Sequence, residues 1–487
     1  MGKTTQTSGT EPSEGKDLKR GLSSLHIQMI SLGGIIGSSY FLGIGDSILN
    51  LGVSTLYALI LGGFIVWLVA NAMGELCVAL PRTGGFVSHA RELVGRPWAA
   101  AVGWSYWVNW CAYVPSEMIA GGLILHMFFP AIGTMYWAIL VGLVISYINL
   151  SDVKNFGKIE SFLALMKIAA ILFFCVMAAL IWFGVIGSSP EAKGILGLQN
   201  VAGPEHDYSK LLPLGLIVIF QRMVMVLVNF QGTEIIALSA AETANPEHSI
   251  PLAIKSVSLR IIAAFVVPVA LVLLILPHTE ASIERSVFVT ALERYGFGWA
   301  SVFFSIVVLG AAVSCANSGL YGAIRALYSL SREGLAPAQF SRVNAHFVPS
   351  WATYVTVGLC WLFVPLFVFF EGSSLYQWLL AVSGFSGAIC WISISWCQLR
   401  FRKQFLASGR KSSDLLYAAP GFPYLSYVAI WVQIASLAFV AFDADLRGCL
   451  YLGVPCVLGP MLWVYFWDKK QAKQQKLSEP EVSSKSA

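Results

Sequence analysis

Long apolar segments recur along almost the whole of this 487-residue chain, and they constrain its fold more than any other feature. Each is about as long as, or longer than, the roughly 20 residues that an α-helix needs to cross a bilayer. Backbone polar groups in lipid must be bonded within the spanning structure, so such segments predict membrane helices. The expected spans cover roughly 27–48, 54–80, 97–129, 134–151, 158–187, 211–240, 250–277, 297–328, 350–371, 376–398, 422–442 and 447–467. We therefore expect an all-α integral membrane protein with about twelve transmembrane helices.

Two of these segments contain residues that do not suit a continuous helix. The first span is interrupted by Gly33, Gly34 and Gly37, and the sixth by residues 229–234, which read Asn-Phe-Gln-Gly-Thr-Glu. A single glycine cluster in a membrane helix usually serves close helix packing. Two broken helices, each opening a set of five spans, instead predict a secondary transporter whose substrate site lies at the breaks.

The two breaks divide the chain into two structural repeats. We expect a cytosolic tail (1–24), a first repeat of spans 1–5 (25–187), an external loop (188–210), a second repeat of spans 6–10 (211–399), spans 11–12 with a preceding basic loop (400–468) and a cytosolic C-terminal tail (469–487). Five is an odd number, so the second repeat must be inserted upside down relative to the first. This plan is the LeuT-type 5+5 inverted repeat with two extra helices, which would lie outside the transport core.

Charged residues make up 12% of the chain and gather between the apolar segments, whereas soluble domains contain about 25%. Lys and Arg concentrate on alternate connections, on the same side as both chain ends. They include Arg82, Arg91, Arg96, Lys154, Lys158, Lys255, Arg325, Arg332, Arg342, Arg400, Arg402, Lys403, Arg410 and Lys411. The positive-inside rule therefore predicts cytosolic termini. The net charge of +5 reflects this topology, so membrane lipid is an expected partner and nucleic acid is not.

Backbone groups at the two breaks are the expected ligands for a zwitterionic substrate, which has a carboxylate and an ammonium group. Helical N–H groups without partners at the first break, over Ile36, Gly37, Ser38 and Ser39, would bind its carboxylate. Freed carbonyls at the second break would bind its ammonium group; the residues there are Phe230, Gln231, Gly232 and Thr233. The alternative is that the glycines only allow tight helix packing.

Several polar or charged residues fall inside apolar spans, where they are costly unless used or paired. Glu234 at the second break can bind a substrate amine, carry a proton or lock two helices together, and Glu117 in span three is similarly ambiguous. Lys167 lies about 15 Å along span five by helical rise. Its ammonium group can replace a bound sodium ion and switch with protonation, or it can be permanently paired. The remaining candidates are Ser314 and Asn317 in span eight, and Arg222, which we expect to snorkel or pair.

No sequence pattern indicates catalysis or a cofactor. The nine cysteines form no CxxC pair and the seven histidines show no ligand spacing, so neither a metal site nor a disulfide framework is indicated. The chain has no Walker A sequence, which disfavours ATP-driven transport by this chain alone. We expect a transporter rather than an enzyme, with no cofactor.

Several short motifs resemble those of bacterial amino-acid permeases in the amino acid–polyamine–organocation superfamily. In chain order they are Arg20-Gly21-Leu22, His26-Ile27-Gln28, Gly33-Gly34-Ile35-Ile36-Gly37, Gly103-Trp104-Ser105-Tyr106-Trp107, Gly232-Thr233-Glu234, Asn245-Pro246 with Ile250-Pro251, Ala316-Asn317-Ser318-Gly319-Leu320-Tyr321, Arg325, and Gly334-Leu335-Ala336-Pro337. The resemblance is nearest to the branch that contains lysine, aromatic amino-acid and S-methylmethionine permeases.

This resemblance implies a LeuT-type fold, twelve spans and amino-acid uptake across the plasma membrane, here the bacterial inner membrane, commonly by proton symport. It also implies proton coupling through Lys167 and an aromatic gate at Phe230, for which the alternative is ordinary packing. The chain departs from the family pattern at two places. The family usually reads Gly-Thr-Gly-Leu-Phe where this chain has residues 37–41, Gly-Ser-Ser-Tyr-Phe, and His248 stands where Lys or Arg is common. The first departure bears on the substrate, because Ser39 replaces a glycine expected to line the substrate carboxylate and Tyr40 adds bulk beside it.

The sequence therefore predicts an amino-acid permease that works by alternating access and proton symport. The competing interpretations are an exchanger without net proton flow and a transporter-like amino-acid receptor. The substrate side chain, the coupling stoichiometry and the oligomeric state are not indicated by the sequence.

Overall fold

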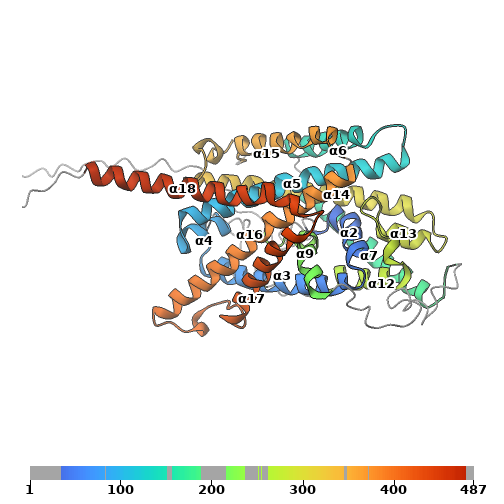
Figure 1. Ribbon diagram of the computed structural model, residues 1–487, viewed down its shortest axis with the longest axis horizontal. Coiled ribbons are helices and arrows are strands. Elements are labelled where there is room, and N and C mark those ends of the chain that lie inside the picture. The colour runs from blue at the N-terminus through green and yellow to red at the C-terminus, as the bar shows by residue number, and fades with distance from the viewer. Residues whose placement is uncertain are drawn as a thin grey trace, which may run out of the picture.

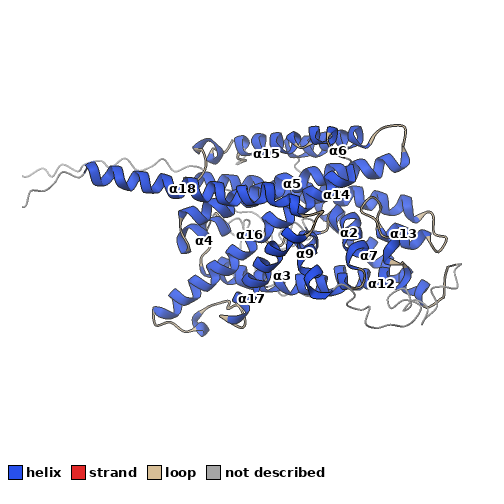
Figure 2. Ribbon diagram, in the orientation of Figure 1, coloured by secondary structure: helices blue, strands red, loops and turns tan. Residues whose placement is uncertain are grey.

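The computed structural model describes residues 35–82, 84–150, 156–187, 215–235, 251, 254, 262–344, 348–370 and 372–478. These residues form helices joined by turns, with no strand among them (Figures 1 and 2). Four parts of the expected plan lie outside the described residues: the N-terminal tail with Gly33 and Gly34, the external loop 188–210, residues 236–250, and residues 479–487. The rest of the expected C-terminal tail, residues 469–478, is described.

Seven described helices are long and apolar enough to cross a membrane. They are α3 (Ser54–Ala79), α5 (Arg96–Phe128), α7 (Phe156–Trp182), α14 (Ala300–Arg332), α16 (Gly372–Ala407), α17 (Tyr424–Phe439, continued by η11, Val440–Phe442) and α18 (Leu450–Ser478, preceded by η12, Arg447–Cys449). Shorter apolar helices are α6 (Thr134–Leu150), α9 (Gly215–Leu227), α12 (Val267–Ile275, preceded by η6, Ile262–Val266) and α15 (Ser350–Leu362, followed by η9, Val364–Val368). The prediction of an all-α, multi-pass membrane protein is confirmed.

The first and sixth spans are both broken where the sequence predicted. In the first, the helix is interrupted at Ile36 and Gly37 and resumes through a π-helical turn, η1 (Ser39–Gly43), into α2 (Ile44–Leu51). In the sixth, α9 ends in a 3₁₀ turn, η4 (Val228–Phe230), and the chain then becomes extended at Gln231. The turns η1 and η4 contact each other, so the two breaks meet inside the molecule.

Helix α5 is the central packing element. It contacts α14, α16, α6 and α18 along their lengths, and all but a few of its residues between Ala99 and Ile124 are buried. Although spans 11 and 12 are additional to the two expected repeats, α18 packs along α5 and α17 packs against α9 and α16. The division into two inverted repeats remains a prediction.

The ends of the molecule carry short extra helices. Helix α4 (Gly85–Leu93) lies at the end where α16 finishes and where α18 projects beyond the bundle (Figure 1). Helix α13 (Val287–Glu293) lies towards the opposite end, in the connection before α14. The same connection contains a short 3₁₀ turn, η7 (His278–Glu280). A second 3₁₀ turn, η8 (Ala338–Ser341), follows α14.

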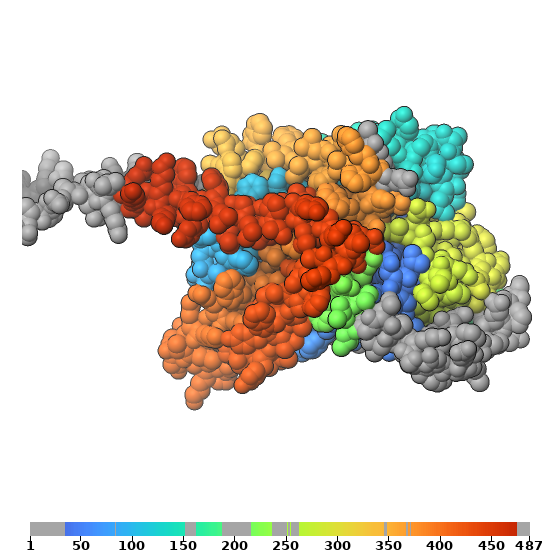
Figure 3. Space-filling view, in the orientation of Figure 1, coloured from blue at the N-terminus to red at the C-terminus, as the bar shows by residue number. Residues whose placement is uncertain are grey.

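Two boundary predictions at the basic end were wrong. Residues 400–407 belong to α16 rather than to a loop, and residues 469–478 continue α18 rather than forming an irregular tail. The space-filling view shows the red end of α18 projecting beyond the other described helices (Figure 3). Both stretches are rich in Lys, Gln, Leu and Ala, together with Arg in the first, and these are strong helix formers. A helix that is already nucleated in the membrane therefore continues into the polar sequence that follows it.

Candidate functional site

The first break presents an N–H group to a buried carboxylate. The backbone N–H of Ser38 donates to both oxygens of Glu117, at 3.1 Å each. Glu117 comes from the middle of α5, and neither residue is exposed. A helix start leaves N–H groups without intrahelical partners, and these groups favour an anion. In this structure the chain's own carboxylate occupies the position that the sequence assigned to a substrate carboxylate.

Gly37 allows this approach because it has no side chain. A Cβ atom at Gly37 would lie 2.4 Å from Oε1 of Glu117, 2.5 Å from the hydroxyl of Tyr113 and 2.8 Å from Sγ of Cys315. These atoms come from α5 and α14, so the break is enclosed from two directions. Of the two readings for this glycine, close backbone approach to polar groups fits the geometry better than plain helix packing.

Two tyrosine hydroxyls complete the surroundings of the first break. Ser39 Oγ and the Tyr113 hydroxyl are 2.8 Å apart, and Ser38 Oγ and the Tyr376 hydroxyl are 2.9 Å apart. Tyr113 precedes Glu117 by one helical turn on α5, whereas Tyr376 is on α16. The serine hydroxyls therefore bond to side chains of two different helices. Ile36, at the break itself, is buried and apolar.

Lys167 is buried between α7 and α14. Its Nζ atom donates to Ser314 Oγ at 2.8 Å, and no part of Lys167 is exposed. Asn317 is buried one turn beyond Ser314 on α14. Ser314 adjoins Cys315, whose Sγ faces Gly37, so the hydrogen bond to Ser314 places Lys167 behind the part of α14 that borders the first break.

The second break is held by Glu234. Its carboxylate accepts hydrogen bonds from the Tyr106 hydroxyl (3.1 Å), from Trp391 Nε1 (3.0 Å) and from the N–H of Gly232 (3.1 and 3.2 Å). Gly232 has φ +106°, a conformation that favours glycine. The Thr233 hydroxyl lies 3.3 Å from the Phe230 carbonyl oxygen and 3.5 Å from the Glu234 carboxylate, and it can donate to either. Because Tyr106 is on α5 and Trp391 on α16, Glu234 ties the break to two helices.

A second polar cluster fixes Gln231. Gln231 Nε2 donates to the carbonyl of Ser383 at 3.0 Å, and its Oε1 accepts from Ser383 Oγ at 2.9 Å. The same hydroxyl is 2.5 Å from Oδ1 of Asn109. Gln231 is therefore anchored to α16 through Ser383, and its side chain is committed to the scaffold in this conformation.

Phe230 packs into an aromatic cluster next to the first break. Its ring lies 4.8 Å from Phe265, which lies 4.7 Å from Tyr40, and it contacts Gly62 of α3. Only 1% of Phe230 is exposed. Packing of this kind is what either a closed gate or a simple core residue would show, so the gating role of Phe230 stays a prediction.

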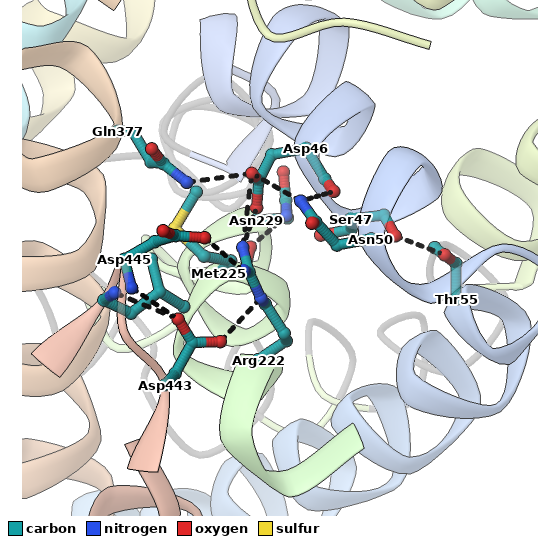
Figure 4. A network of polar contacts seen from close by, with 11 residues as sticks. Asp46, Ser47, Asn50, Thr55, Arg222, Met225, Asn229, Gln377, Asp443 and Asp445 are labelled. Carbon is teal, nitrogen blue, oxygen red and sulfur yellow. Dashed lines mark hydrogen bonds and ion pairs between the residues drawn. The ribbon is translucent and has the colours of Figure 1, made fainter. Parts of the chain in front are cut away.

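A network of charges joins α2 and α9 to the connection between α17 and α18 (Figure 4). Arg222 on α9 pairs with Asp46 (3.3 Å), Asp443 (2.7 Å) and Asp445 (2.6 Å), and Gln377 also donates to Asp46 at 2.9 Å. The Arg222, Asp46 and Asp443 side chains are each less than a tenth exposed, whereas that of Asp445 is 59% exposed. Of the two expectations for Arg222, pairing is therefore confirmed.

Several residues of the site were not singled out from the sequence. They are Tyr106, Asn109 and Tyr113 on α5, and Tyr376, Ser383 and Trp391 on α16. On α5 these residues and Glu117 recur every three or four positions, which places them on one helix face. On α16 the separations are seven and eight residues, again one face. A polar stripe along an apolar span was thus the available signal.

Apolar helices around two polar breaks define a multi-pass helical membrane protein with a buried polar site. Residues 26–478 match the model of the amino acid permease family. The amino-acid permease RocC of Bacillus subtilis (strain 168) is 31% identical over 96% of this chain and 98% of its own length. The lysine-specific permease LysP of Escherichia coli (strain K12) is 29% identical over 94% of each chain. The gamma-aminobutyric acid permease of Bacillus subtilis (strain 168) is 31% identical over 96% of this chain and 97% of its own.

The chain belongs to the amino acid permease family, within the amino acid–polyamine–organocation superfamily. The names of its relatives indicate transporters rather than enzymes, and the family implies a small-molecule amino acid as substrate.

Proposed function

We propose that this protein imports an amino acid across the bacterial inner membrane by proton symport and alternating access, with both termini in the cytosol. The observation that supports the proposal is the hydrogen bond from the Ser38 N–H group to Glu117, because the N–H group at this break already bonds to a carboxylate. The basic residues at the end of the bundle with α4 support the orientation.

The substrate carboxylate would replace the Glu117 carboxylate at the Ser38 N–H group. Both groups are anions with the same preference for unpartnered helical N–H donors, so one excludes the other. Protonation of Glu117 removes its charge and weakens its charge-assisted hydrogen bond, which in the charged form is roughly twice as strong as a neutral one. A proton bound at Glu117 would therefore favour substrate binding at the first break, and this linkage is the basis of symport.

The charge of Lys167 would respond when the substrate carboxylate replaces the Glu117 carboxylate. The Lys167 ammonium group donates to Ser314, the residue before the Cys315 that faces Gly37 at the first break. When Glu117 becomes neutral, an incoming substrate carboxylate restores the balance of charge around Lys167. Because a buried lysine changes its protonation readily, its charge can couple the proton to the change of access.

The ammonium group of the substrate would bind carbonyls near Phe230 and Gly232, since η1 and η4 are in contact. Phe230 would close over the substrate from the outer side. Glu234 would hold the second break in shape rather than bind substrate, because Tyr106, Trp391 and Gly232 already occupy its oxygens.

The test is uptake of a panel of labelled amino acids into proteoliposomes, with and without an inward proton gradient. We expect gradient-driven accumulation of one or a few amino acids by the wild type. Lys167→Ala should lose this accumulation while retaining exchange of substrate across the membrane. Uptake that is indifferent to the gradient and requires amino acid inside the vesicles would instead establish an exchanger. Binding without any flux would establish a receptor.

A further inference from the structure

A cavity lies on the outer surface of the bundle, away from the two breaks. Its volume is about 660 Å³, and it lies between the start of α5, the second half of α16 and the first half of α17. Trp98, Trp396 and Trp431 contribute to its wall, together with Tyr427. Trp and Tyr concentrate where a membrane protein passes from the hydrocarbon region to the headgroups. Trp431 is 64% exposed, so the cavity opens to the surroundings rather than into the core.

Two cations lie at one end of this cavity, and no acidic residue lines it. Arg400 lies over Trp396, with its guanidinium carbon 5.8 Å from the ring centre, and Lys403 Nζ lies at the hydroxyl edge of Tyr427, 5.6 Å from the ring centre. Lys403 Nζ also donates to the Tyr427 hydroxyl at 3.0 Å. Neither cation has an ion pair within the described part of the chain. Aromatic rings hold both side chains in position while leaving their positive charge uncompensated.

The rest of the cavity is apolar. Along α16, Ile392 precedes Lys403 by eleven residues, which is about 16 Å of helix. Along α17, Ile430 and Ile434 follow Tyr427 on the same side of the cavity. The cavity therefore runs from a positively charged end, through aromatic rings, to aliphatic side chains. This order of charge, interfacial aromatics and hydrocarbon matches that of a phospholipid from headgroup to acyl chain.

We propose that this cavity binds an anionic phospholipid, with its phosphate between Arg400 and Lys403 and an acyl chain along Ile392, Ile430 and Ile434. The lipid would connect α5 and α16, which both carry residues of the transport site, to α17. The proposal rests on the membrane location of the protein and is independent of the substrate and of proton coupling.

Binding can be measured by native mass spectrometry of the full-length protein with phosphatidylglycerol and with phosphatidylcholine. Wild type should bind phosphatidylglycerol in preference to phosphatidylcholine. The double variant Arg400→Gln/Lys403→Gln should bind phosphatidylglycerol about 30-fold more weakly, which corresponds to about 1 kcal/mol for each basic residue. Lys469→Gln/Lys470→Gln removes the same charge from exposed positions at the end of α18 and should leave binding unchanged.

The charge-conserving swap Arg400→Lys/Lys403→Arg keeps the test valid if the neutral variant folds poorly, and it should retain most of the affinity. Glycerol 3-phosphate, which has the headgroup chemistry without acyl chains, should not compete at matched concentration. Equal affinity for the two lipids, equal loss in the α18 control, or full competition by glycerol 3-phosphate would overturn the proposal.

Discussion

Replacing Gly37 by alanine is the sharpest test of the enclosed first break. The added methyl group would meet Glu117 Oε1 at 2.4 Å, the Tyr113 hydroxyl at 2.5 Å and Cys315 Sγ at 2.8 Å. All three distances are well inside the roughly 3.5–4.0 Å of a normal non-bonded contact. Glu117 and Tyr113 cannot easily move away, because their hydrogen bonds to Ser38 and Ser39 hold them at the break.

Overpacking of this kind costs about 1–3 kcal/mol. If the added methyl group destabilises the substrate-binding conformation by this amount, the affinity for the amino acid should drop about 5- to 150-fold, because about 1.4 kcal/mol corresponds to a factor of ten. The assay is equilibrium binding of the labelled amino acid to purified protein, with thermal unfolding measured in parallel. The matched control is Gly358→Ala in α15, where a Cβ would meet nothing within 4 Å. Binding by Gly37→Ala within a factor of two of the wild type and of this control would refute the argument.

Three further substitutions test the neighbouring features of the site. Glu234→Gln should lower the free energy of unfolding by about 1–3 kcal/mol because it weakens charge-assisted hydrogen bonds. The KM of this variant for uptake should equal that of the wild type. A raised KM would mean that Glu234 binds substrate. Arg222→Met should lower the free energy of unfolding by about 3–5 kcal/mol, because it leaves Asp46 and Asp443 buried without their cation; thermal unfolding that matches the wild type would contradict this. If the Phe230 ring gates the site, Phe230→Ala should release bound substrate about tenfold faster in a stopped-flow chase, because an aromatic contact contributes about 0.5–1.5 kcal/mol. An unchanged release rate would mean that Phe230 is a packing residue.

The spans and the two breaks were predictable because they depend on composition and local backbone preference. Apolar length identifies a span, and glycines with small polar residues identify a break, without knowledge of the rest of the chain. The end of α18 was missed because residues 469–478 are polar but still favour a helix. Composition alone marked that stretch as a tail.

The partners within the site could not be read from residue types alone. Glu117 and Glu234 look alike in the sequence, yet one carboxylate binds the N–H group of Ser38 in another helix and the other binds its own break together with Tyr106 and Trp391. Such differences arise from contacts between residues far apart in the chain. For the same reason, the pairing of Arg222 with Asp443 from the connection between α17 and α18 was not foreseen.

The most direct test of the account is the pH dependence of substrate binding to wild type and to Glu117→Gln, at constant ionic strength. If protonated Glu117 releases the Ser38 N–H group to the substrate carboxylate, wild-type affinity should be highest at low pH. It should fall by up to tenfold per pH unit once Glu117 loses its proton. The glutamine variant, which has no charge to lose at this position, should lack the part of the pH dependence that comes from Glu117. The account would be contradicted by the same pH dependence in both proteins, or by loss of binding in Glu117→Gln at every pH.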